Sequence, residues 1–218
     1  MYELLIIAAF ATFAVYNLTV HDDEIASASR KIGDRIGRLW DIAHRSMKEN
    51  RMLRAEKALI TILKIDERNA AAYNRLGILY AKQKEYRDAI DCFEIASSLE
   101  ATPSSLHNLG LIYYETENYD KAAIAFEQAI KLEDKLAARH VAYAKVQEKL
   151  GNHKLMVQEL EIASEIEPSR EIYELLKKAY QHEGMSESAD LVESKIKKIS
   201  KQTKRPKKVL RPSQRVVI

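Results

Sequence analysis

The six histidines, the single cysteine and the adjacent acidic pairs are the residues of this chain that could carry catalysis or hold a metal ion. A zinc site favours histidines four residues apart on a helix, or cysteines close by, whereas these histidines are scattered. Cys92 is alone, which excludes a disulfide framework, and it is most simply a small core residue beside Phe93. The pair Asp22-Asp23 is typical of a solvated surface. The sequence therefore predicts no enzyme, no metal site and no cofactor.

The elements that would position any functional residue follow from a 33-residue repeat within residues 70–136. Two series of small, aromatic and aliphatic residues match position by position. The first series is Tyr73, Leu76, Gly77, Tyr80, Ala89, Phe93, Ala96 and Leu99, and the second is Leu106, Leu109, Gly110, Tyr113, Ala122, Phe126, Ala129 and Leu132. The first four members of each series fall on one helical face, and a second stripe follows after a polar turn. Each series therefore predicts a helical hairpin, and an ordinary helical bundle is the less favoured alternative because generic amphipathicity does not match so many positions.

These residues resemble the tetratricopeptide repeat, a helix–turn–helix unit of about 34 residues. Fainter copies flank the central pair, so the resemblance implies an all-α solenoid of about five helical hairpins. The expected repeats are 36–69, 70–102, 103–136, 137–169 and 170–199. Their turns are expected at Asn50, Lys84-Glu85, Glu117-Asn118, Gly151-Asn152 and Gly184. Glycine in the middle of a helix allows close approach, and we expect Phe93 and Phe126 to fill the space beside Gly77 and Gly110.

The N-terminal segment is the most apolar part of the chain, with no charged residue from Leu4 to Val20. This length is at the short end of what spans a bilayer as a helix. A cleaved signal peptide would need a basic start and a small-residue cleavage site, and neither is evident here. We therefore predict a single-pass transmembrane anchor over residues 1–21, with membrane contact through residues 2–20. A signal peptide and a buried first helix are the alternatives.

Basic residues follow this segment but do not precede it. Arg30, Lys31, Arg35 and Arg38 lie within the distance over which such charges set orientation. The pattern predicts an N-terminus outside the membrane, a polar connector over residues 22–35, and cytoplasmic repeats.

The C-terminal segment is strongly basic. Residues 201–218 hold seven lysines or arginines and no acid, which leaves 28 basic and 32 acidic residues in the rest of the chain. Pro206 and Pro212 interrupt any helical stripe, and we predict a disordered tail over residues 200–218. This tail could simply aid solubility, contact anionic lipid, or contact RNA phosphates. It has no aromatic residue for stacking on bases.

In the tetratricopeptide repeat family, the first helix of each hairpin lines a concave surface that binds partner proteins. The resemblance therefore implies a binding groove on these helices. Its candidate residues are Asn74, Ile78, His107, Asn108, Leu111, Tyr114, Val141 and Lys145. The amides of Asn74 and Asn108 suit an extended peptide backbone, whereas Ile78 and Leu111 could instead pack between neighbouring helices.

The first hypothesis for function is a membrane-anchored adaptor that binds a partner protein or peptide at the cytoplasmic face. Its layout is similar to that of the lipopolysaccharide assembly protein B family, although this chain lacks that family's four-cysteine metal module, so neither partner nor pathway transfers. The alternative is an RNA- or ribosome-associated protein that contacts phosphates through its basic tail. The sequence predicts no particular oligomeric state.

Overall fold

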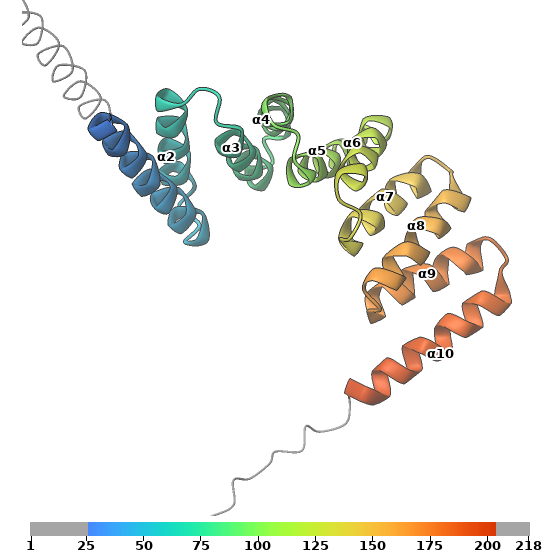
Figure 1. Ribbon diagram of the computed structural model, residues 1–218. Coiled ribbons are helices and arrows are strands. Elements are labelled where there is room, and N and C mark those ends of the chain that lie inside the picture. Colours follow the sequence, from blue (N-terminus) through green and yellow to red (C-terminus); the bar gives the residue numbers. More distant parts are fainter. Residues whose placement is uncertain (1–25, 204–218) are drawn as a thin grey trace, which may run out of the picture. The chain divides into compact units, whose positions relative to one another are not determined.

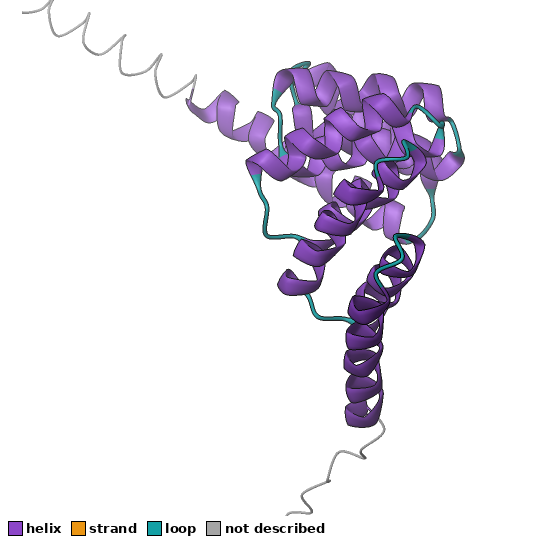
Figure 2. Cartoon of the chain, turned by 90° about the vertical axis from the view of Figure 1, so that its right-hand side faces the viewer, coloured by secondary structure: helices purple, strands orange, loops and turns teal. Residues whose placement is uncertain are grey.

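The computed structural model describes residues 26–203. The predicted transmembrane anchor and most of the basic tail lie outside these residues. The similarity in layout to the lipopolysaccharide assembly protein B family depends on that anchor. Within the described range every regular element is a helix (Figure 2). None of these helices is long and apolar enough to cross a membrane.

The chain divides into two compact units, with the boundary between Glu100 and Ala101. The first unit contains a helix over residues 26–48, followed by α2 (Met52–Ile65), α3 (Ala70–Gln83) and α4 (Tyr86–Leu99). The second contains α5 (Pro103–Glu115), α6 (Tyr119–Leu132), α7 (Ala137–Lys149), α8 (His153–Ile166), α9 (Arg170–His182) and α10 (Ser186–Thr203). Successive helices form hairpins within each unit (Figure 1).

The helix bounds can be compared with the expected repeats. Helices α3, α5, α7 and α9 begin at residues 70, 103, 137 and 170, where the sequence predicts that repeats begin. The helix over residues 26–48 runs from the predicted connector into the predicted first repeat. At the other end, α10 continues to Thr203, beyond the predicted start of the tail.

The repeated glycines and phenylalanines make the close contacts that the sequence predicts. A Cβ atom added to Gly77 would lie 2.7 Å from the ring of Phe93, and one added to Gly110 would lie 2.8 Å from the ring of Phe126. Both rings are only 1% exposed. The absence of a side chain at the two glycines therefore allows α3 to pack against α4 and α5 against α6. Leu132, at the end of the second series, is an exception because it is 55% exposed.

Each helical hairpin closes with the same backbone arrangement. The five residues at these turns with positive φ are Asn50, Lys84, Glu117, Gly151 and Gly184, which confirms the predicted turn positions. In every case the amide of the next residue donates to the carbonyl five residues earlier, as Glu85 does to Tyr80. This left-handed cap satisfies carbonyl groups at the end of the preceding helix.

Each unit has its own apolar core. In the first unit, the helix over residues 26–48 contributes Ala43 and the half-buried Trp40, which pack with Leu59 and Ile62 of α2. Cys92 also packs against this core, as predicted. Burial, with smaller contributions from Asp88 and Asp91, raises the pKa of the Cys92 thiol to about 11. The thiol is therefore protonated at neutral pH and is a poor nucleophile.

Candidate functional site

A groove lies on the second unit, between the first helices of two successive hairpins. It has a volume of about 480 Å³, within the range of about 300–1,000 Å³ that is common for ligand sites. Helix α5 contributes His107, Leu111, Tyr114 and Glu115, and α7 contributes Ala138, Val141, Ala142 and Lys145. Phe126 of α6 and the segment leading into α9 complete the lining.

The floor of the groove is apolar because these helices present small or aliphatic residues to it. Ala138 and Ala142 are one helical turn apart on α7, and their small side chains leave room in the groove for a ligand. Leu111 of α5 is 40% exposed, although its neighbours Ile112 and Tyr113 are buried. An exposed leucine beside small residues is a suitable surface for an apolar side chain of a ligand.

The rim of the groove carries more negative than positive charge. Its charged residues are Glu115, Lys145, Glu167 and Glu171. Glu171 lies in the first turn of α9, whose N-terminus is capped by Ser169 through a bond from the amide of Ile172 at 3.3 Å. The three carboxylates and single ammonium favour a ligand with basic groups.

His107 occupies a half-buried position in the groove. Burial lowers the pKa of its imidazole, and the positive charge of Arg139 lowers it further. The ring is therefore neutral at pH 7, and it packs edge-on against Phe126 with ring centroids 5.4 Å apart. Its Nδ1 atom is buried and has no hydrogen-bond partner in the described part of the chain.

Buried polar residues that no sequence motif marks hold α7 in place. His140 is 3% exposed, with Nδ1 2.7 Å from the carboxylate of Glu159 and Nε2 2.8 Å from the carbonyl oxygen of Asp134. The ring therefore bridges the carboxylate of Glu159 on α8 and the loop that precedes α7. Arg139 donates to the carbonyl oxygen of Glu133 at 3.0 Å. These contacts tie α7 to α8 and to the preceding loop.

The eight candidate groove residues divide between the two units. His107, Leu111, Tyr114, Val141 and Lys145 come together in the groove. Asn108 lies on α5 but does not line the groove. Asn74 and Ile78 lie on α3, which belongs to the first unit. Asn74 and Asn108 are half-buried and both already interact with other residues.

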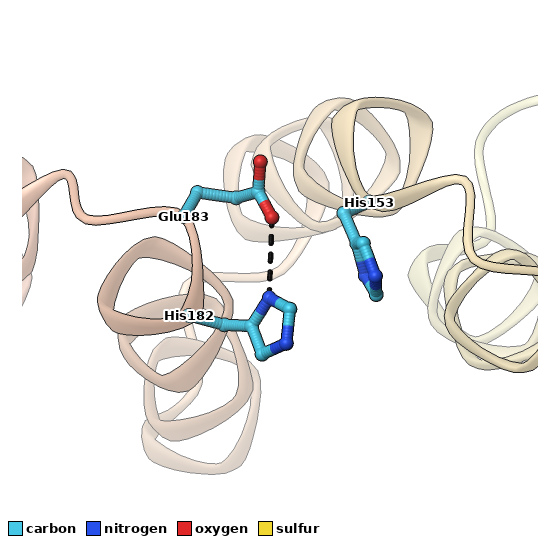
Figure 3. Close-up of side chains that lie close together, drawn as sticks. All are labelled: His153, His182 and Glu183. Carbon is cyan, nitrogen blue, oxygen red and sulfur yellow. Dashed lines mark hydrogen bonds and ion pairs between the residues drawn. The ribbon is translucent and has the colours of Figure 1, made fainter.

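A second cluster lies near the ends of α8 and α9 and includes two of the histidines that the sequence separates. The rings of His153 and His182 lie 4.4 Å apart between centroids, and Glu183 follows directly (Figure 3). One ligand atom from each of the three lies within 4.8 Å of the others. These two histidines are far apart in the sequence, and the fold brings them together. The missed signal is their placement two residues after Gly151 and two residues before Gly184.

A family model of the tetratricopeptide repeat matches residues 68–135, the part of the chain with both glycine–phenylalanine contacts. These residues form tetratricopeptide repeats. Among curated proteins no match is found.

Solved structures with similar repeats share the fold at low sequence identity. A crystal structure of MamA is 21% identical, with a TM-score of 0.72, over 83% of this chain and 100% of MamA. MamA from Desulfovibrio magneticus RS-1, from residue 41 to its end, is 13% identical with a TM-score of 0.71, over 80% of this chain and 99% of that one. YrrB, described as a TPR protein with an unusual peptide-binding site, is 19% identical with a TM-score of 0.62, over 71% and 80% of the two chains. These similarities show an all-α fold of repeated helical hairpins.

Proposed function

We propose that this protein is an adaptor that binds an extended peptide segment of a partner protein in the groove between α5 and α7. The observation that carries the proposal is the groove itself, with a floor of Leu111, Val141 and two alanines and a mainly acidic rim. Tetratricopeptide repeats serve as interaction scaffolds, and the repeated hairpins here support that role. YrrB, which has the same fold, is described as having a peptide-binding site.

The chemistry of the groove restricts the ligand. An apolar side chain would cover Leu111 and Val141, and flanking lysines or arginines would face Glu115 and Glu171. The preferred peptide is therefore one with an apolar residue beside basic residues. The ammonium group of Lys145 provides a place for a single carboxylate or backbone carbonyl of the ligand.

The proposal is tested by selecting peptides from a random library on the full-length chain. We expect enrichment of apolar residues flanked by lysine or arginine. Leu111→Gln should then weaken binding of the selected peptide by roughly tenfold or more, because the loss of a central interface side chain costs about 1–2 kcal/mol of binding free energy. Ile124→Gln is the matched control, since Ile124 is 56% exposed on α6 and does not line the groove. Equal weakening by both variants, or by neither, would refute the groove assignment.

We further propose that residues 2–20 anchor the chain in a membrane with the repeats on the cytoplasmic side. The support is the uncharged stretch from Leu4 to Val20 and the basic residues that follow it. Fractionation with protease protection tests the anchor and its orientation together. Recovery of the chain in the soluble fraction would contradict the anchor.

Deletion of residues 201–218 separates the adaptor role from the alternative of an RNA-associated protein. Peptide binding in the groove should survive this deletion, because the groove lies on α5 and α7. If the protein instead binds RNA through its tail, the deletion should abolish RNA binding. Added salt should also weaken RNA binding by the intact chain.

A further inference from the structure

We propose that His153, His182 and Glu183 form a binding site for a divalent transition-metal ion, with Zn²⁺ as the best match. The site belongs to the second unit and is separate from the proposed peptide-binding role. It joins the first residue of α8 to the C-terminal end of α9 (Figure 3).

One distance within the cluster already matches that of a coordination shell, and the others lie within reach of it. Zinc bonds of about 2.0–2.2 Å to nitrogen and oxygen imply ligand atoms roughly 3.3 Å apart in a tetrahedron. Nδ1 of His182 already lies 3.1 Å from Oε1 of Glu183, and all three ligand atoms lie within 4.8 Å of one another. Small side-chain rotations would therefore complete the shell. The side chain of His182 is 61% exposed, which leaves it room to rotate.

The donor set determines the class of metal. Two imidazoles and one carboxylate suit Zn²⁺ and the neighbouring transition metals, whereas Mg²⁺ and Ca²⁺ prefer oxygen ligands. Three protein ligands leave a fourth position for water or for a group of another molecule. Nδ1 of His153 is buried and has no hydrogen-bond partner in the part of the chain that the structure describes.

The helix ends around the cluster have opposing effects on a bound cation. His182 is the last residue of α9 and Glu183 is its C-cap, where the helix dipole is negative and attracts positive charge. His153 is the first residue of α8, where the dipole is positive, but a neutral imidazole binds through its lone pair. Lys145, Glu148 and Lys178 line the hollow beside the two histidines, and the lysines reduce the affinity.

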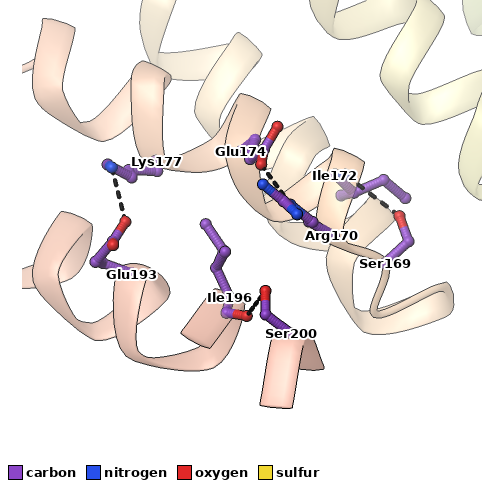
Figure 4. Close-up of polar contacts among 8 residues, drawn as sticks. All are labelled: Ser169, Arg170, Ile172, Glu174, Lys177, Glu193, Ile196 and Ser200. Atoms are coloured by element: carbon purple, nitrogen blue, oxygen red, sulfur yellow. Dashed lines mark hydrogen bonds and ion pairs between the residues drawn. The ribbon is translucent and has the colours of Figure 1, made fainter. Parts of the chain in front are cut away.

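The framework that presents His182 is fixed at several points. Helix α9 is capped by Ser169 at its start, and Lys177 donates to Glu193 of α10 at 2.7 Å (Figure 4). At its end, the left-handed Gly184 closes the turn, with φ of 71°. The metal ligands are therefore placed by rigid helix ends and not by a long loop.

The test uses the full-length chain without a polyhistidine tag, freed of metal with a chelator and then titrated with Zn²⁺ alone. We expect one Zn²⁺ per chain. His182→Gln and Glu183→Gln should each weaken binding by at least about tenfold, since even outer-shell partners of metal ligands change affinity by about 10- to 100-fold. His44→Gln is the matched control, because it removes an exposed histidine of the first unit and should leave binding unchanged.

A spectroscopic readout separates coordination from loss of structure. Co²⁺ bound to this site should give visible absorption bands of a low-coordinate nitrogen and oxygen environment, and these bands should disappear in His182→Gln while the helical circular dichroism is retained. The proposal is overturned if the wild-type chain binds no Zn²⁺, or if His182→Gln and Glu183→Gln bind it as tightly as the wild type does.

Discussion

The contact between paired helices differs between the hairpins α3/α4 and α5/α6 and the last hairpin, α9/α10. In the first two, a glycine faces a buried phenylalanine, as Gly110 faces Phe126. The same two repeat positions in the last hairpin hold Lys177 and Glu193, which form an ion pair 2.7 Å long with side chains about one-third exposed. The position in the repeat therefore determines which two residues meet, and the types of these residues determine whether the contact is apolar or ionic.

The hairpin α7/α8 is intermediate between these cases. Ala144 and Leu160 occupy the two positions, and both are buried. Alanine on the first helix is larger than the glycine of the other hairpins, and leucine on the second helix is smaller than their phenylalanine. The ion pair of α9/α10 is partly exposed, whereas the pair Ala144/Leu160 is buried.

The largest expected effect comes from removing a central ring. Phe126→Ala should destabilise the chain by about 3–5 kcal/mol, because the ring is fully buried and leaves a cavity. Glu193→Ala at the equivalent position should have a much smaller effect. Urea denaturation followed by circular dichroism measures both, and a similar loss in the two variants would break the comparison.

The complementarity of glycine and phenylalanine can be measured with a double-mutant cycle. Gly110→Ala places a Cβ atom 2.8 Å from the ring of Phe126. Overpacking costs about 1–3 kcal/mol, and the gain of about 1 kcal/mol in helix propensity offsets it only in part. The double variant with Phe126→Leu reproduces the pair Ala144/Leu160. It should lose less stability than the sum of the two single variants, and strict additivity would show that the two positions do not interact.

The ion pair of the last hairpin should respond to pH. The bond from Lys177 lowers the pKa of Glu193 from its ordinary value. The pair therefore contributes its full stability above the carboxyl's ordinary pKa and loses it as pH falls through the lowered value. The stability difference between the wild type and Glu193→Gln should shrink in acid and in high salt. A difference that stays constant would show that the ion pair contributes no stability.

The smallest expected effect concerns the turns. Lys84, the C-cap of α3, has a φ of 65°, whereas Gly184, which follows the C-cap of α9, has a φ of 71°. Lys84→Gly removes the strain of a left-handed residue with a side chain, about 1–2 kcal/mol, but it also raises the conformational entropy of the unfolded state. We expect a net gain in the free energy of unfolding of about 0.5 kcal/mol. Lys84→Ala is the control because it keeps a Cβ atom, and it should give no gain in thermal unfolding. A gain equal to that of Lys84→Gly would contradict the strain argument.

The hairpins are well predicted by the sequence because their packing depends on residues that recur at fixed spacing. The spacing alone pairs Gly77 and Gly110 with their partner rings, and it also places the turn residues. The resemblance to the tetratricopeptide repeat further implies that first helices such as α5 and α7 line a groove. It does not show that Asn74 lies in a different unit from Asn108, because the division at Glu100 leaves no mark in the repeat.

The polar sites are harder to predict. His140 pairs with Glu159 across two helices, and His153 meets His182 from turns about thirty residues apart, so neither contact follows a helical spacing. The first contact depends on how α7 packs against α8 within one hairpin, and the second depends on how that hairpin stacks on the next.

The most direct test of the proposed adaptor role is photo-crosslinking of the full-length chain. A photoreactive amino acid replaces Leu111 in the groove or Ile124 outside it, and the selected peptide is added before irradiation. We predict a covalent adduct from position 111 and none from position 124. Adducts only from position 124, or equally from both positions, would contradict the assignment of the groove between α5 and α7 as the binding site.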